Sequence, residues 1–173
     1  MPSETAPPAT LRYRLQQLSF LVCSRIFVAV YRRFPVFGRL RTSLAVVWRQ
    51  GRLLMIERSD RLGCAFPGGV SMPWESDEVS MRRELREETG LESRADRLLF
   101  RYRDDSRIPV AISVYWVEAH GEPRSSWEGV ALWLAPAEAE ARIFPLHAVA
   151  LARVQVEGLL QISRDPGNHS GVH

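Results

Sequence analysis

Three glutamates, Glu84, Glu87 and Glu88, are spaced so that a helix would place them on one face. Side chains three and four positions apart are neighbours on a helix surface, and like charges there are destabilising. A hard divalent cation between carboxylates offsets that repulsion, and Mg²⁺ commonly joins carboxylates to substrate phosphates. The neighbouring Arg83 and Arg86 allow a simpler explanation, because acidic helices with interspersed arginines are often solvated faces. Spacing alone therefore leaves two interpretations, a metal site and a charged surface.

The residues around these glutamates carry the start and stop signals of a helix. Ser76 is suited to cap an N-terminus, and acidic residues follow it in the first turn. Gly90 stands where a helix commonly ends in a left-handed residue. Upstream, Gly68 and Gly69 predict a turn. The sequence therefore predicts a glycine turn that leads into a helix over residues 77–89, which carries the carboxylates.

The rest of the chain predicts strands on both sides of this helix, followed by two further helices. The β-rich runs TSLAVVW and RLLMIER are joined by RQG, which is typical of a hairpin. Residues 59–67 are expected to form a loop. Later strands are expected at 98–103, 110–118 and 130–134, and helices at 135–141 and 146–162. This pattern indicates a mixed sheet with helices, of the α/β or α+β class.

Length and composition are those of a single globular domain with modest extensions. The chain has 173 residues, of which 46% are hydrophobic and 25% charged. Its basic residues are all arginine, and seven of them precede Thr42, where Glu4 is the only acid. Because only this arm is basic, we expect no nucleic-acid partner. Cys23 and Cys64 lack disulfide or zinc spacing, which favours a cytoplasmic location.

The N-terminal segment differs in character from the rest of the chain. Residues 1–10 are rich in Pro, Ala, Ser and Thr and are predicted to be disordered. Residues 11–41 are predicted to hold a basic amphipathic helix, whose apolar stretch is short for a membrane span and interrupted by Arg25. Its open roles are packing on the domain or in a homodimer, peripheral contact with an anionic membrane, and weak membrane insertion. Residues 164–173 are expected to form a flexible tail.

Counted from Gly69 to Leu91, the spacing of the charged and small residues is similar to the signature of the Nudix hydrolases. That signature is G-x5-E-x7-R-E-U-x-E-E-x-G-U, where U is a bulky aliphatic residue, and every fixed position matches. The resemblance implies the Nudix fold, an α/β/α sandwich with a mixed sheet, over residues 42–163. It also implies hydrolysis of a nucleoside diphosphate linked to another moiety, with Mg²⁺ or Mn²⁺ as cofactor.

The resemblance implies a role for each charged position of the box. Four groups at its helix and turn are expected to bind metal, namely the Gly68 carbonyl, Glu84, Glu87 and Glu88. Glu87 or Glu84 is also a candidate for the general base. Arg83 is expected to pair with Glu75 and to orient the carboxylates, while Leu85 and Leu91 are expected in the core.

Outside the box, Glu128 precedes a predicted strand in WEGVALWL. It resembles a loop glutamate that binds metal or acts as base in some MutT-like members. Asp104 and Asp105 are alternatives for the same role. Arg58 and Arg61 flank the loop on the side of the site and are candidates for phosphate contacts.

Two other functions compete with a catalytic hydrolase. One is a non-catalytic, nucleotide-binding Nudix domain, which the complete set of box carboxylates disfavours. The other is a Nudix-fold isoprenoid diphosphate isomerase, whose branch usually carries a catalytic cysteine near the box. Cys64 is the residue that could serve there. The box itself does not indicate which pyrophosphate is the substrate.

Overall fold

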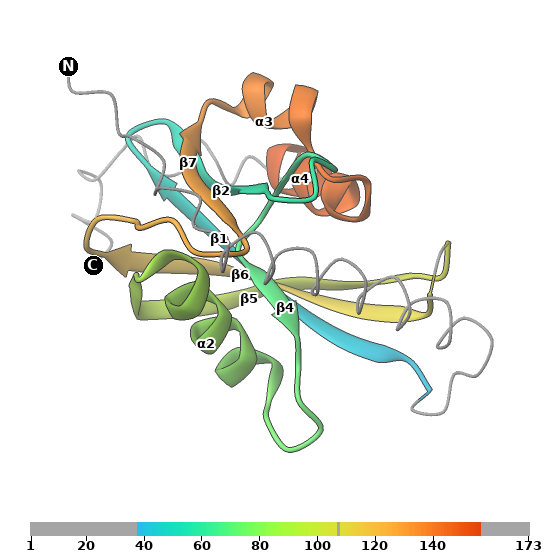
Figure 1. The fold of residues 1–173 in the computed structure, drawn as a ribbon. Coiled ribbons are helices and arrows are strands. Elements are labelled where there is room, and N and C mark those ends of the chain that lie inside the picture. Colours follow the sequence, from blue (N-terminus) through green and yellow to red (C-terminus); the bar gives the residue numbers. More distant parts are fainter. Residues whose placement is uncertain (1–37, 107, 157–173) are drawn as a thin grey trace, which may run out of the picture.

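The computed structural model describes residues 38–106 and 108–156 (Figure 1). The predicted disordered start, the predicted flexible tail and all but residues 38–41 of the segment 11–41 predicted to hold a helix lie outside the described residues. The first strand, β1 (Leu40–Arg49), begins two residues before the predicted start of the domain at Thr42. In the described ranges, no helix is long and apolar enough to cross a membrane.

The described strands form one mixed seven-stranded sheet, in the order β3-β2-β1-β6-β5, with β4 pairing β1 and β7 pairing β2. After β1 they are β2 (Arg52–Arg58), β3 (Cys64–Ala65), β4 (Gly68–Val70), β5 (Glu92–Asp104), β6 (Val110–His120) and β7 (Gly129–Leu134). β1 runs parallel to β6 and antiparallel to β2 and β4. This arrangement confirms the predicted mixed sheet.

The predicted hairpin between β1 and β2 is present, with Arg49 opposite Arg52. Its two turn residues, Gln50 and Gly51, have φ angles of 49° and 80°. Two consecutive left-handed residues match the right-handed twist of the flanking strands, as in a type I′ turn. The turn therefore fixes the register in which β1 and β2 pair.

Three boundaries differ from the predictions. Residues 59–67 were expected to be a loop, but they contain β3, which pairs with Ile56 and Glu57. β5 begins at Glu92 rather than near Leu98, and its polar first half is held by pairing with β6 across register shifts. The C-terminal helix begins as a 3₁₀ turn, η1 (Pro145–His147), before α4 (Ala148–Val156). In each case long-range pairing or packing decides a boundary that local pattern leaves open.

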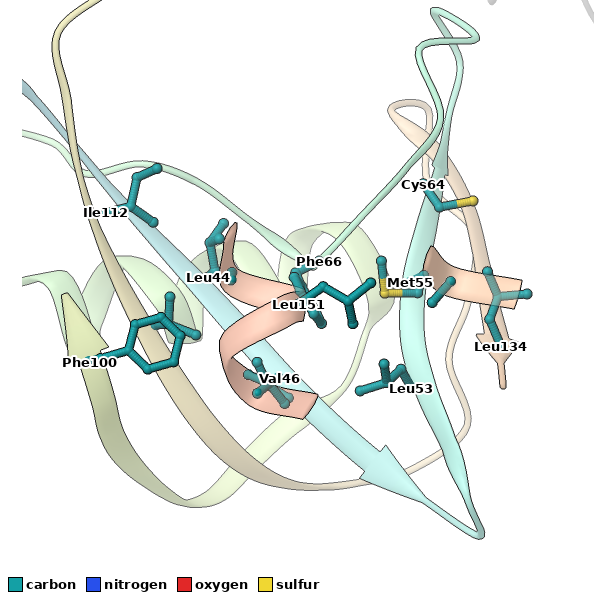
Figure 2. Close-up of a cluster of buried hydrophobic side chains, with 14 of the residues drawn as sticks. Leu44, Val46, Leu53, Met55, Cys64, Phe66, Phe100, Ile112, Leu134 and Leu151 are labelled. Atoms are coloured by element: carbon teal, nitrogen blue, oxygen red, sulfur yellow. The ribbon is translucent and has the colours of Figure 1, made fainter. Parts of the chain in front are cut away.

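β1 is buried on both faces, and its side chains alternate between two apolar cores. Leu44 and Val46 point to the side covered by α3 (Pro136–Arg142) and α4, where they join the cluster shown in Figure 2. Ala45 and Val47 point to the side covered by α2 (Asp77–Thr89). Figure 1 shows these helices on opposite sides of the sheet, which confirms the predicted α/β/α layers.

Candidate active site

The helix that carries the glutamates is fixed at both ends and on one face. Ser76 caps it by accepting a hydrogen bond from the Val79 N–H at 3.2 Å, and Gly90 ends it with a φ of 71°. Met81 and Leu85 are fully buried and pack against the β1 residues of the same core. This apolar face sets the rotation of α2, and so determines where its carboxylates lie.

Arg83 connects the charged groups around the start of α2. Its guanidinium donates to Glu75 at 2.8 Å, to Glu84 at 2.7 Å and to Glu87 at 3.2 Å. It also donates to the Val70 carbonyl at 3.3 Å, so it binds β4 as well. The bonds from Arg83 lower the pKa of Glu75 to about 2, which keeps this partner charged. The predicted Glu75–Arg83 ion pair is present.

The two glycines before the helix are required by close packing against β1 and α2. Gly68 has a φ of 148°, and a Cβ there would collide with the Ser43 carbonyl oxygen and lie 2.9 Å from the Leu44 Cα. A Cβ on Gly69 would lie 2.6 Å from the carboxylate of Glu84. A glycine is therefore needed at Gly68 for backbone reasons and at Gly69 to leave room for a carboxylate.

Glu88 is the most buried carboxylate of the cluster, with 8% of its surface exposed. It accepts a hydrogen bond from the Gly68 N–H at 2.8 Å. Burial raises the pKa of Glu88 well above its usual range, and the charges of Glu128 and Glu84 raise it further. Burial also raises the pKa of Glu84, although Arg83 opposes this. The surroundings beside the glycine turn therefore disfavour the charged form of both carboxyl groups unless a cation compensates.

Glu128 approaches this cluster from the loop before β7, forty residues after Glu88 in the chain. Its charge acts on both Glu84 and Glu88, so the three carboxylates are electrostatic neighbours. The alternatives lie elsewhere: Asp105 pairs with Arg39, and Asp104 accepts from the Ser106 N–H at 2.7 Å. Of the residues considered outside the box, Glu128 is the one that the fold brings to α2.

The carboxylates of Glu84, Glu87 and Glu88 do not converge on a single cation position in this structure. Across residues 38–106 and 108–156, no three His, Cys, Asp or Glu side chains converge on such a position. Arg83 draws Glu84 and Glu87 toward itself, and the Gly68 N–H holds Glu88. The donor set nevertheless suits a hard cation, since carboxylate oxygens and a turn carbonyl are ligands that Mg²⁺ accepts. Binding would require the Glu84 and Glu87 side chains to rotate away from Arg83.

Cys64 and Arg58 have structural partners. Cys64 is fully buried, and burial raises the pKa of its thiol, so it lies in the core as a neutral side chain. Arg58 donates to Asp60 at 3.0 Å and lies 4.4 Å above the Phe144 ring. A buried thiol removes the main support for an isomerase.

Fold and site together define an α/β protein whose acidic helix faces a glycine turn. The NUDIX domain family model matches residues 38–159, and the chain therefore belongs to the Nudix family. This family comprises hydrolases that generally cleave pyrophosphate linkages.

Individual relatives agree with this assignment. A MutT-like protein from Streptomyces ambofaciens is 36% identical over 118 residues, which cover 68% of this chain and 77% of that protein. The solution structure of the E. coli ORF135 protein is similar at a TM-score of 0.61 and 25% identity, covering 75% of this chain and 95% of the other. The NUDIX domain of Shewanella oneidensis NrtR, solved with ADP ribose, is similar at a TM-score of 0.60 and 20% identity, covering 70% and 89%. The last similarity concerns the fold alone.

Proposed function

We propose that this protein hydrolyses the pyrophosphate linkage of a nucleoside diphosphate derivative, with Mg²⁺ or Mn²⁺ as cofactor. The observation that carries the proposal is the convergence of Glu128 with Glu84 and Glu88 beside the glycine turn. Buried negative charge of this kind is costly unless a cation neutralises it. The ADP ribose bound to the NrtR domain supports a nucleotide derivative as ligand.

The metal would be held by oxygens of Glu84, Glu87 and Glu88 and by the carbonyl of Gly68. When bound, it neutralises phosphate charge and lowers the pKa of a water molecule. Arg83 would keep its bonds to Glu75 while it releases Glu84 and Glu87. The Glu75 pair thus holds the helix start in place while the other carboxylates reorient.

The reaction itself requires a base. A water oxygen forms a bond to one phosphorus, the bridging P–O bond breaks, and the proton of the water passes to a carboxylate. Glu84, Glu87 and Glu128 are the candidates for this base. Among the described residues Glu128 forms no ion pair with an arginine, whereas the other two are bound by Arg83. We therefore rank Glu128 first.

The test is a screen with Mg²⁺ for the phosphomonoester or pyrophosphate products of nucleotide sugars, dinucleoside polyphosphates, ADP-ribose, NADH, CoA and oxidised dNTPs. The wild type should hydrolyse at least one class, and Glu88→Gln should lower kcat by about 10²- to 10⁴-fold. Glu92→Gln, an exposed change in β5, is the matched control and should keep the wild-type rate. An equal rate for Glu88→Gln would overturn the metal assignment.

Two further measurements separate catalysis from binding. Titration of Mn²⁺ by calorimetry should show weaker binding to Glu88→Gln than to the wild type and to Glu92→Gln. Nucleotide binding without turnover of any class would instead favour the non-catalytic alternative.

To identify the base, Glu84→Gln, Glu87→Gln and Glu128→Gln are compared by pH–rate profile. The variant that loses the acidic limb of the profile while retaining Mn²⁺ affinity identifies it.

A further inference from the structure

A pocket of about 610 Å³ opens beside the carboxylate cluster, at the edge of the sheet formed by β2 and β7. This volume lies within the usual range of ligand pockets, about 300–1,000 Å³. Its walls come from the end of β2, the loop to β3, the start of β7 and the end of α3. The charged and hydroxyl side chains that line this pocket are those of Glu57, Arg58, Ser59, Arg61 and Arg142.

This pocket adjoins the segment that carries Glu128. The Ser59 N–H donates to the Glu128 carbonyl at 3.1 Å, and Arg58 pairs with Gly129 in the ladder between β2 and β7. Glu128 directly precedes Gly129, which lines the pocket, and its charge acts on Glu84 and Glu88. A substrate whose reacting phosphorus lies at the carboxylates would extend into the pocket by passing this residue.

The three arginines of the pocket differ in their availability. Arg58 is held by Asp60, and Arg142 is paired with Glu57. Within the described part of the chain, Arg61 makes no side-chain hydrogen bond or ion pair, and it is exposed. Its φ of 62° is uncommon for a residue other than glycine, and its N–H donates to the Arg58 carbonyl at 3.1 Å. The loop thus presents Arg61 at the pocket from a conformation that few residue types adopt.

We propose that this pocket binds an additional phosphate group of the substrate, outside the linkage that is cleaved, through Arg61, with the guanidinium of Arg142, although paired with Glu57, as a second positive group beside it. This inference rests on the proposed function and specifies the substrate class, a pyrophosphate whose nucleoside carries a further phosphate ester. A guanidinium presents two parallel N–H donors, which match two oxygens of one phosphate. Arg58 supplies positive potential from a fixed position, and Glu57 limits the net charge of the pocket.

Matched substrate pairs that differ by one phosphate test the proposal directly. Suitable pairs are CoA with dephospho-CoA and NADPH with NADH. The wild type should show a KM about fivefold lower for the phosphorylated member, as expected for an ionic contact that is partly exposed. Arg61→Asn should abolish this preference by raising the KM of the phosphorylated member alone, with kcat unchanged. Asparagine is chosen because it tolerates the left-handed backbone.

Control variants separate charge from loop geometry. Arg61→Lys keeps the charge and should retain part of the preference. Arg94→Asn removes an exposed arginine on β5, at the opposite edge of the sheet, and should leave the preference intact. Glu57→Gln removes the partner of Arg142 and should increase the preference. The proposal is wrong if the wild type does not distinguish the members of either pair, or if Arg61→Asn changes both members equally.

A binding measurement keeps this inference separable from the proposed reaction. Without metal, 2′,5′-ADP should bind the wild type about fivefold more tightly than AMP, and Arg61→Asn should bind the two equally. The difference should shrink at high salt, because a surface ionic contact is screened. Equal binding by the wild type contradicts the pocket assignment even where hydrolysis is found. Absence of hydrolysis with selective 2′,5′-ADP binding contradicts the reaction and supports the pocket.

Discussion

The two sides of α2 deal with buried charge in opposite ways. On the side of the glycine loop, Glu75 and Arg83 form a complete ion pair, and the arginine lowers the pKa of its partner to about 2. On the side of β7, Glu88 has other carboxylates as neighbours, and its pKa is raised by burial and by the charges of Glu128 and Glu84. One side is electrostatically satisfied within the protein, and the other is not.

The Glu75 side and the Glu88 side of α2 therefore have different structural roles. A satisfied ion pair holds the helix start against β4, since Arg83 also donates to the Val70 carbonyl. An unsatisfied carboxylate cluster is stable only because the rest of the fold compensates, and under the proposed function a cation would offset its charge. Removing charge should therefore destabilise the first side and relieve the second.

The largest effect is expected from the glycine that joins the two sides. In Gly68→Ala the new methyl group would collide with the Ser43 carbonyl, and alanine cannot adopt a φ of 148° without strain. We expect a loss of about 3 kcal/mol in the free energy of unfolding, because backbone atoms must move. Urea unfolding of the wild type and of Gly68→Ala measures this loss in the free energy of unfolding. A loss below about 1 kcal/mol would mean that the contact between β1 and β4 adapts easily.

Matched amide substitutions test the comparison itself. Glu75→Gln removes the charge that pairs with Arg83 and should lower the free energy of unfolding by about 2 kcal/mol. Glu88→Gln keeps the oxygen that accepts from the Gly68 N–H and cannot carry the charge that burial disfavours at this position, so its stability should equal or exceed that of the wild type. Urea unfolding without metal measures the free energy of unfolding of both variants. Equal losses of stability in the two variants would contradict the proposed difference between the Glu75 side and the Glu88 side of α2.

A smaller effect is expected at Gly69, where only a side chain stands in the way. The methyl group of Gly69→Ala would lie 2.6 Å from the Glu84 carboxylate, which can rotate aside. We expect stability close to wild type and kcat lowered about tenfold, because a displaced ligand weakens transition-state binding. Steady-state kinetics and thermal unfolding of the same sample measure both. Wild-type kcat would mean that the position of Glu84 is not critical.

The smallest effect concerns a buried ionisable group that has no charged partner. His147 accepts a hydrogen bond at Nδ1 from the Phe66 N–H at 3.1 Å, and burial, with the nearby charge of Arg58, lowers its pKa to about 3. The unfolded chain binds this proton near pH 6.5, about where a free imidazole titrates, and the folded chain does not. Stability should therefore fall as the pH decreases through about 6.5, by about 0.7 kcal/mol between pH 7 and pH 6.

His147→Asn supplies the control for that measurement, since its side chain keeps an acceptor but does not titrate. The difference in unfolding free energy between wild type and variant should narrow as the pH falls from 7 to 6. A constant difference over this interval would show that His147 does not stay neutral in the folded protein.

Local sequence predicted the acidic helix closely, because its signals are short-range. Ser76 and Gly90 set the start and the end of α2, and Leu85, which was expected in the core, lies on its buried face. The hairpin of β1 and β2 was predicted for the same reason, since its turn residues adjoin the strands. Strand β3 was missed because two residues carry no periodic pattern, and its pairing partner is supplied by β2.

In the candidate site, too, some features follow from the local sequence and others only from the tertiary structure. The box spacing places Glu84, Glu87 and Glu88 on one helix with Arg83 beside them, and a fixed helical period is enough for that inference. The choice of Glu128 over Asp104 and Asp105 required the tertiary structure, because those segments are far apart in the chain. The same holds for the arginine pocket, where Arg58 is bound to Asp60 while Arg61 is presented by a left-handed backbone.

The sequence by itself determined that this is a Nudix protein with an acidic helix after a glycine turn, because those features depend on neighbours within a few residues. Only the tertiary structure decided which distant carboxylate joins the helix, why Gly68 admits no side chain, and that a pocket with three arginines lies beside Glu128. These properties depend on strand pairing between β1, β2, β4 and β7, and pairing brings together residues whose separation in the chain carries no periodic signal.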